Sequence, residues 1–246
     1  MRPLSYVALA FLLTSTFSFA VPQEVPAPVD TLFVPNVFDA NDNVEVVLHG
    51  EFVSSCYGIG NVKIDKNLAE QLITVRPTAY FYTDAVCIQA ITPFVRPVQL
   101  GVLPKGNYRV EVITENAQLA GNLPIAPNTV NENDPILYAP VDNAFLRRSS
   151  GGDKQQIVLQ GTYPTFVNGC MEIVEVETTL EKDDVLLVEP KVEIIDNEIC
   201  EKQSEEDRAF EVVTDLNQPF SGEGLLHVRA LHGASLNRYL FVRPRL

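Results

Sequence analysis

Val44-Glu45-Val46-Val47-Leu48-His49-Gly50-Glu51-Phe52 is the stretch that decides the fold, because it recurs as Gln155-Gln156-Ile157-Val158-Leu159-Gln160-Gly161-Thr162-Tyr163. The offset between the two copies is a constant 111 residues. Side chains of a β-strand point alternately to opposite faces. Both stretches are therefore predicted to be strands that bury the same face: Val46, Leu48, Gly50 and Phe52 in the first copy, and Ile157, Leu159, Gly161 and Tyr163 in the second.

The repeat continues beyond these strands. Val75-Arg76-Pro77 matches Val188-Glu189-Pro190, and the four cysteines fall at matching places in the two halves. Gly, Pro and Asn punctuate short alternating stretches, a pattern typical of antiparallel sandwiches. A chain of 246 residues also has the length of two ordinary domains. The sequence predicts an all-β protein with two tandem Ig-like antiparallel β-sandwich domains, an internal duplication with about seven strands per module.

Residues 1–20 have the features of a secretory signal peptide. A basic start is followed by an apolar run at 6–13, and we expect cleavage after Ala20. Residues 21–30 contain three prolines and are expected to be an extended leader. The first module is predicted at 31–127 and the second at 136–246, joined by a polar, proline-bounded linker at 128–135.

The signal-like segment at residues 1–20 also predicts export without a membrane anchor. The apolar run is shorter than the roughly 20 residues that cross a bilayer, and no later stretch is longer. The residue directly after the predicted cleavage site is Val21 and not a cysteine, so the lipid-attachment residue of a bacterial lipoprotein is missing. We expect a periplasmic or secreted protein. None of the 16 asparagines begins an N-x-S/T sequon, which favours a bacterial envelope.

The four cysteines are expected to form disulfides, because an exported chain meets an oxidising environment and contains no C-x-x-C pair. The repeat favours Cys56 with Cys87 and Cys170 with Cys200 over the two other connectivities. Each bridge closes a loop of about 30 residues, which is worth roughly 3 to 4 kcal/mol of stability in the chain-entropy model.

The stretch at 103–112, Leu-Pro-Lys-Gly-Asn-Tyr-Arg-Val-Glu-Val, resembles the turn and penultimate strand of fibronectin type III and bacterial Ig-like modules. In those families a proline-glycine turn delivers a tyrosine into a core-facing strand. The resemblance implies that Tyr108 is buried. It concerns the fold and does not fix a function.

Nothing in the sequence points to catalysis. The chain has three histidines, and strand alternation turns His49 and His227 away from the core, where we expect solvated side chains; His232 is expected in a turn. The serine-hydrolase elbow, the metalloprotease helix motif and the nucleotide-binding glycine loops are all missing. Sugar cleavage is disfavoured because no tryptophan supplies an aromatic platform. We expect a non-enzymatic protein.

The turn Asp39-Ala40-Asn41-Asp42-Asn43 is the sharpest local signal for a ligand. It resembles the D-x-N-D-N linker motif of cadherins, which implies calcium ligands at Asp39, Asn41 and Asp42, and calcium prefers several oxygen ligands from one loop. A plain Asx-rich turn between two strands is the favoured interpretation. No other cofactor or metal is expected.

The charge disfavours nucleic acid as a partner, because the formal net charge is −14 and phosphate recognition needs basic groups. Residues 172–211 hold 15 acidic and 4 basic residues, and we interpret this excess as solvated strand faces rather than a binding surface. The run Tyr80-Phe81-Tyr82 must expose at least one ring. Core packing with one ring at the edge is the favoured interpretation, and a contact surface for a protein or glycan partner is the alternative.

The hypothesis for function is an exported, non-enzymatic binding or structural module of the cell envelope or extracellular space. The first alternative is a two-domain periplasmic chaperone, which would use paired basic residues; Arg147-Arg148 and Arg243-Pro244-Arg245 are the only basic clusters. The second alternative is a hydrolase with dispersed catalytic residues, which a crevice holding a carboxylate or histidine of perturbed pKa would favour.

Overall fold

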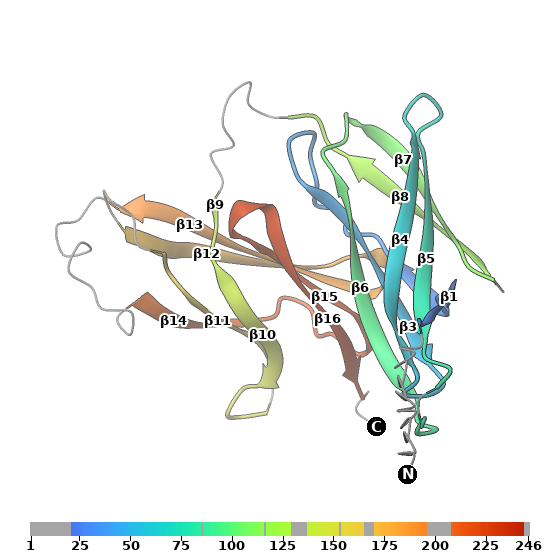
Figure 1. Cartoon of the computed structure of the whole chain (residues 1–246). Coiled ribbons are helices and arrows are strands. Elements are labelled where there is room, and N and C mark those ends of the chain that lie inside the picture. The colour runs from blue at the N-terminus through green and yellow to red at the C-terminus, as the bar shows by residue number, and fades with distance from the viewer. Residues whose placement is uncertain are drawn as a thin grey trace, which may run out of the picture.

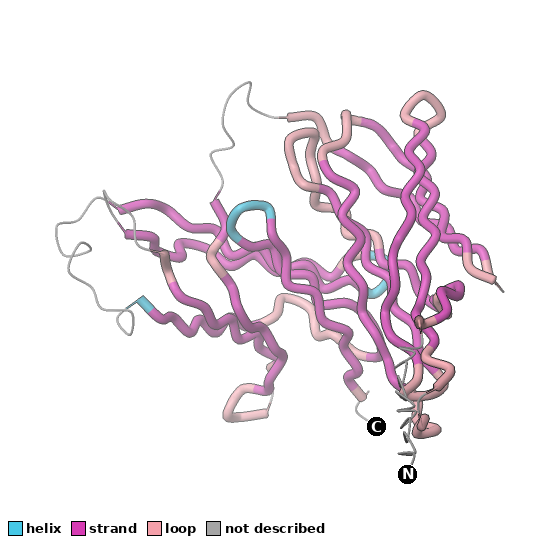
Figure 2. The backbone as a smooth tube through the Cα atoms, viewed as in Figure 1, coloured by secondary structure: helices cyan, strands magenta, loops and turns pink. Residues whose placement is uncertain are grey.

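The computed structural model describes residues 21–84, 86–115, 117–128, 137–152, 154–164, 170–195 and 208–243. These residues form sixteen β-strands and two short 3-10 turns (Figures 1 and 2). The protein is therefore all-β. In this part of the chain no helix is long and apolar enough to span a membrane. The predicted signal peptide, the linker from residue 129 onward and Cys200 lie outside the described residues.

Two sheets make up the first sandwich. The three-stranded sheet is antiparallel and has the order β2 (Val29–Phe33), β3 (Val44–Phe52), β6 (Thr92–Gly101). The five-stranded sheet is built around β5, which pairs with β4 along one edge and with β1 and β7 along the other, while β8 pairs with β7. These strands are β1 (Gln23–Pro26), β4 (Tyr57–Asn67), β5 (Leu72–Phe81), β7 (Gly106–Ile113) and β8 (Gln118–Ile125).

The second sandwich repeats this arrangement strand for strand. Its three-stranded sheet has the order β10 (Val141–Arg148), β11 (Gln155–Thr162), β14 (Ala209–Asp215). In its five-stranded sheet β13 pairs with β12, β9 and β15, and β15 pairs with β16. These strands are β9 (Leu137–Tyr138), β12 (Cys170–Leu180), β13 (Val185–Ile195), β15 (Gly222–Ala230) and β16 (Ala234–Val242). Each sandwich thus has eight strands where about seven were expected.

The core-facing residues of β3 and β11 are those that the alternation predicts. Val46 and Leu48 are buried in the core of the first sandwich, and Ile157 and Leu159 in that of the second. Apolar side chains of all the longer strands of each sandwich except β4 and β14 supply the rest of the buried core, with partly buried residues of β4 and β14 packed against it. Burial of these aliphatic groups, at about 25 cal/mol per Å² of apolar surface, is the main stabilising contribution in each module.

The repeated glycine has the same role in both sandwiches. An ideal Cβ on Gly50 would lie 2.0 Å from the carbonyl oxygen of Pro28, and one on Gly161 would lie 2.1 Å from that of Pro140. A phenylalanine ring closes the other side of each glycine: Phe94 in the first sandwich and Phe210 in the second. The backbones approach so closely here that a side chain does not fit.

The local resemblance of 103–112 is confirmed as far as packing goes. Tyr108 is buried, and its hydroxyl donates a hydrogen bond to the carbonyl oxygen of Pro104 at 3.0 Å. The strand directions differ from those of an Ig domain, because β5 and β7 run parallel to each other, as do β13 and β15. Ig sandwiches are built from antiparallel sheets. The resemblance therefore holds for a β-sandwich in general.

The first of the predicted disulfides is confirmed. Cys56 and Cys87 are bridged, with their Cα atoms 5.2 Å apart. The bridge ties the β3–β4 connection to the β5–β6 connection at one end of the first sandwich. The partner predicted for Cys170 is Cys200, which is outside the described residues, so that pairing stays a prediction.

The segment expected to be an extended leader belongs to the sandwich. Residues 23–26 are extended, but they form β1, which pairs with β5 from Gln23 opposite Phe81 to Pro26 opposite Thr78. Ala27 and Val29, which follow, are buried in the core. Proline in this segment is compatible with strand pairing, because β1 is a short edge strand.

Replacing the repeated glycines tests the close approach of the backbones. Gly50→Ala and Gly161→Ala should each lower the free energy of unfolding by about 1 to 3 kcal/mol, because the added methyl group forces the strand and the proline carbonyl apart. Gly58→Ala is the matched control: its Cβ would meet Tyr82 at an ordinary 3.6 Å, and we expect little change. Urea unfolding measures all three. Equal losses in the three variants would contradict the packing described here.

Candidate functional site

The outer face of β3 does not face water. Val47 lies on it, opposite the core-facing residues, and packs with Phe33 against Val185 and Leu225 of the second sandwich. The three-stranded sheet of the first module and the five-stranded sheet of the second are thus in direct contact, as Figure 1 shows for β3 and β6 beside β15 and β16. We call this contact the junction. Three of the polar residues that sequence analysis singled out, His49, His227 and Asp42, take part in it.

Glu45 is the buried carboxylate of the junction. Ser235 and Asn237 of β16 both donate hydrogen bonds to its Oε1, the latter at 2.7 Å, and Gln99 of β6 donates to its Oε2. A buried charge without partners would cost several kcal/mol. The second sandwich therefore supplies groups that the first sandwich needs to bury Glu45.

His227 lies next to this carboxylate and is fully buried. Its Nδ1 is 2.8 Å from Oδ1 of Asn237 and 3.6 Å from Oε1 of Glu45. The amide nitrogen of Asn237 already donates to Glu45, so Oδ1 accepts and Nδ1 carries the proton. Nε2 is buried without a hydrogen-bond partner, and the ring meets Phe38 edge-on at 6.0 Å. Burial lowers the pKa of His227, with Arg229 adding to this and Asn237 and Glu45 opposing it. The imidazole is therefore neutral at neutral pH.

Arg229 extends the junction toward the predicted calcium turn. Its guanidinium forms a two-pronged ion pair with Asp42 and donates to the carbonyl oxygen of Val37 at 3.2 Å. It also lies over the rings of Phe38 and Tyr138, at 5.2 and 4.8 Å from their centroids. Burial lowers the pKa of Arg229, but the hydrogen bonds and charge of Asp42 outweigh it and raise the pKa above its ordinary value. Arg229 is a permanent cation held by the first sandwich.

His49 and Tyr239 form the third contact of the junction. Their rings stack with centroids 3.8 Å apart and planes 7° apart. The hydroxyl of Tyr239 donates to Glu223 at 2.6 Å, and its pKa is raised to about 12 by burial and by that carboxylate. Burial likewise raises the pKa of the nearby Asp30 carboxyl. The Nε2 of His49 is buried and has no hydrogen-bond partner.

The expectation that His49 and His227 are solvated is wrong. Both do point away from the core of their own sandwich, as the alternation predicts, but each is buried against the other module. One signal in the sequence was available: consecutive apolar residues interrupt the alternation, Val46-Val47-Leu48 in β3 and Leu225-Leu226 in β15, as is typical of strands covered on both faces. His232 lies in the turn η3 (Leu231–Gly233), with a left-handed φ of 62°.

The calcium turn is folded by its own hydrogen bonds. Asp39 Oδ1 accepts from the backbone N–H of Asn41 at 3.1 Å, and Asp42 Oδ2 accepts from that of Asp39 at 2.9 Å. The carboxylate of Asp42 is also engaged by Arg229, a competing cation. Among the residues that the structure describes, no group of three His, Cys, Asp or Glu side chains is placed to hold a metal ion. Calcium binding at Asp39, Asn41 and Asp42 stays a prediction.

The three rings of the aromatic run 80–82 differ in their exposure to water. Tyr80 is partly buried, and its hydroxyl accepts a hydrogen bond from Asn61 at 2.9 Å. Phe81 packs on Tyr57, with the ring centroids 4.8 Å apart. Tyr82 is exposed. The run ends next to the disulfide, since the N–H of Tyr82 donates to the carbonyl of Cys56. A contact role for these three residues stays a prediction, with Tyr82 as the ring that a partner can reach.

The acidic stretch is only partly described, because residues 196–207 are outside the described ranges. In the visible part, Lys191 of β13 bridges Glu175 and Glu177 of β12 at 3.1 and 2.8 Å. These hydrogen bonds raise the pKa of Lys191. Exposed pairs of this kind contribute little to stability. They are compatible with the solvated strand face that the sequence suggests.

The junction also borders a cavity of about 250 Å³ that is lined by residues such as Asp42, Tyr138, Arg229 and His232. Its charged groups are already paired with each other. His227 hydrogen-bonds to an amide rather than to a hydroxyl or thiol, so it activates no nucleophile in this arrangement. The junction is arranged to hold two sandwiches together.

The fold and the junction define a tandem β-sandwich protein whose modules are packed face to face. Residues 46–124, from β3 to β8, match the family model of the ORF11 beta-sandwich domain. The match covers about a third of the chain and makes this part similar to that family. No curated protein and no solved structure matches the chain. The comparisons therefore support the sandwich class and indicate no activity.

Acidification should weaken the protein through His227. Its pKa is lowered in the folded state below the ordinary 6.5, so the unfolded chain binds more protons as the pH falls through and below that value. The stabilising contribution of the neutral ring is present above pH 6.5 and is lost below it. His227→Asn keeps a donor near Asn237 but does not titrate, so its stability should fall less between pH 7 and 5 than that of the wild type.

Chemical denaturation across this pH range measures the effect, and His232→Asn is the control, because His232 is an exposed turn residue. The control should follow the wild type. Parallel curves for wild type and His227→Asn would contradict the assignment of this pH dependence to the junction.

Removing the arginine of the junction should be costly. Arg229→Met leaves the Asp42 carboxylate without its cation in a largely buried place, and we expect a loss of about 3 kcal/mol or more. Arg109→Met is the matched control, because Arg109 pairs with Glu111 on the surface and its side chain is 64% exposed. That pair is worth at most about 1 kcal/mol. Similar losses in the two variants, measured by urea unfolding, would contradict a structural role for Arg229.

Proposed function

We propose that this chain is an exported, non-enzymatic binding or structural module of the cell envelope or extracellular space. The observation that carries the proposal is the use of polar residues in the junction. Two of the three histidines, His49 and His227, are buried there together with Glu45 and Arg229. Side chains that in an enzyme would meet a substrate here hold one sandwich against the other.

Export is supported by two features of the chain. One is the signal-like segment at residues 1–20, and the other is the Cys56–Cys87 bridge, since disulfides persist in oxidising compartments. We infer a periplasmic or secreted location. Binding is supported by apolar and aromatic side chains that remain exposed near that bridge, Tyr82 among them.

The chaperone alternative has less support. A chaperone of this type needs free basic residues to hold a carboxylate, whereas Arg229, the arginine at the junction, is paired with Asp42. Arg147 and Arg148 are exposed at the end of β10, away from the junction, and Nε of Arg147 donates to Gln156 at 3.2 Å. For a hydrolase, the histidine of perturbed pKa is His227, which is sealed in the junction rather than placed in a crevice.

Native fractionation tests location and association together. In cells that make this chain, we expect it in the periplasm or medium with Val21 as the first residue and with Cys56 and Cys87 oxidised. On gel filtration of that native fraction it should elute in a complex well above the 27.3 kDa of the uncleaved 246-residue chain. A reduced, full-length chain in the cytoplasm would contradict export. Elution of the exported chain only as a free monomer would contradict a binding or structural function.

A further inference from the structure

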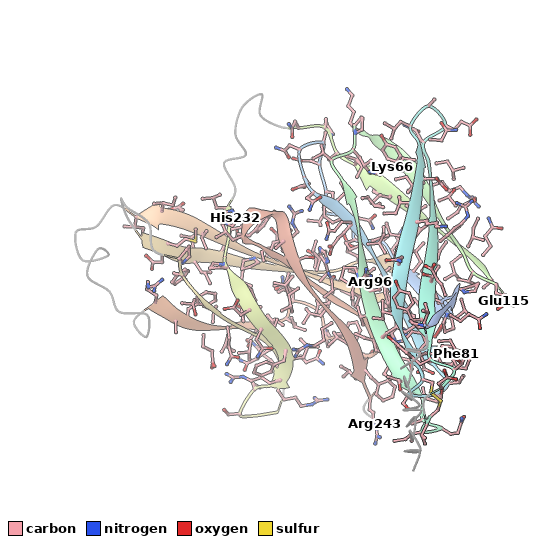
Figure 3. All side chains as sticks on the ribbon, in the orientation of Figure 1. Lys66, Phe81, Arg96, Glu115, His232 and Arg243 are labelled. Carbon is pink, nitrogen blue, oxygen red and sulfur yellow. A yellow bond between two sulfur atoms is a disulfide. The ribbon has the colours of Figure 1, made fainter. Side chains whose placement is uncertain are left out.

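One end of the first sandwich exposes aliphatic side chains. Val86 is 99% exposed, Ile88 and Ile91 are each 69% exposed, and Val53 is 67% exposed. Val86, Ile88 and Ile91 lie in the β5–β6 connection, and Val53 lies in the β3–β4 connection next to it. We call these four residues the apolar end. In Figure 3 this end lies near Phe81, opposite the end marked by Lys66.

The apolar end is held in place rather than left loose. The Cys56–Cys87 bridge joins its two connections. The backbone N–H of Ser55 donates to the carbonyl of Ile88 at 3.0 Å, and the N–H of Ile88 donates back to the hydroxyl of Ser55 at 2.9 Å. The loop therefore presents Ile88 in water in a defined position. Such preorganisation reduces the entropy lost when a partner binds.

A groove adjoins the apolar end and shares Val53 with it. It encloses about 260 Å³ between β1, the end of β3 and the start of β4. Apolar residues and one carboxylate line it: Val25, Pro26, Pro28, Phe52, Val53, Tyr57 and Glu115. The apolar end and the groove together form a continuous surface, and the groove is large enough for an apolar side chain of another molecule.

The fold itself does not require this surface to be apolar. In the repeat, Cys87 corresponds to Cys200, so the loop at 82–91 corresponds to the sequence around 196–207. That second stretch has six acidic residues and one lysine and contains a single aliphatic side chain, Ile199. The two copies therefore differ in composition at the place where the first exposes its aliphatic residues.

Among the described residues, the charged side chains that the two connections and the groove lining contribute to the rim of this surface are all acidic. The stretches 51–57 and 82–91 contain Glu51 and Asp84 and no lysine or arginine, and Glu115 borders the groove. A bilayer is disfavoured as the occupant, because membrane surfaces are negatively charged and tips that insert into them carry basic residues. A second copy of the chain is also disfavoured, because it would bring the same carboxylates against each other.

We propose that the apolar end and its groove dock a protein partner through a segment of aliphatic or aromatic residues flanked by lysine or arginine. This rests on the proposed binding function and names its surface. Apolar contacts in the centre and ion pairs at the rim are the usual anatomy of a protein interface. The acidic rim selects the sign of the partner's flanking charges and speeds association at low salt.

Photo-crosslinking in cells that make the chain tests the occupant. A benzophenone amino acid placed at position 88 or 91 should give a protein adduct, and mass spectrometry should place the crosslink in an apolar segment flanked by basic residues. Position 68 is the control, because Leu68 is also an exposed aliphatic residue, 48% exposed, in the turn at the opposite end of the sandwich. Adducts with lipid, with the chain itself, equally at position 68, or with nothing would each overturn the proposal.

Affinity for the crosslinked partner gives the second readout. Ile88→Asp should weaken binding at least about tenfold, and Leu68→Asp should leave it unchanged. Glu51→Lys with Asp84→Lys should weaken binding and flatten its dependence on salt. Because all these residues are exposed, each variant should keep the wild-type melting temperature. Unchanged affinity in Ile88→Asp would overturn the docking surface.

The two proposals fail in different ways. If the exported chain elutes in a native complex but crosslinks away from positions 88 and 91, the docking surface is wrong and the binding function stands. If the exported chain elutes only as a monomer and gives no adduct at any position, both are wrong.

Discussion

The burial of Glu45 is the constraint on which the arrangement of the two modules depends. Its carboxylate leaves water only because Ser235 and Asn237 of the second sandwich donate to it, with Gln99 on the other side. Removing the second sandwich would expose this charge and with it the apolar face around Val47. The first sandwich is thus complete only against its neighbour. A buried polar network of this kind is costly when half satisfied, so it favours one docking geometry over others.

The rest of the junction follows from the same strand. Because the side chains of β3 alternate between its two faces, Glu45, Val47 and His49 share the outer face, and each contacts a different group of the second module. The Glu45 carboxylate accepts hydrogen bonds from the second module, and Val47 packs against Val185 and Leu225. The His49 imidazole stacks on the ring of Tyr239. Arg229 and Asp42 close one edge. The junction therefore combines apolar burial with hydrogen bonds to Glu45 and the Arg229–Asp42 ion pair, and these polar contacts favour one register of the two sheets.

Sequence alternation could predict which way each strand residue faces, but not what covers it. It correctly turned Val46 and Leu48 toward the core and His49 and His227 away from it, and the repeat correctly paired Cys56 with Cys87. It treated the outward face as solvated because polar residues on a strand are usually exposed. The contact between modules joins residues about 190 positions apart, such as Glu45 and Asn237, and no local pattern reports on such a pair. The parallel pairing of β5 with β7 also joins strands that are not consecutive in the chain, so sequence alternation did not predict it.

We infer that the two sandwiches form one rigid body, with Glu45, His227 and Arg229 buried in the junction and the apolar end beside the disulfide. Amide ¹⁵N relaxation of the intact protein tests this claim most directly. Strand residues of both modules should report the same rotational correlation time and a common diffusion tensor. Separate, shorter correlation times for the two modules would contradict it, because Glu45 and His227 would then face water for much of the time.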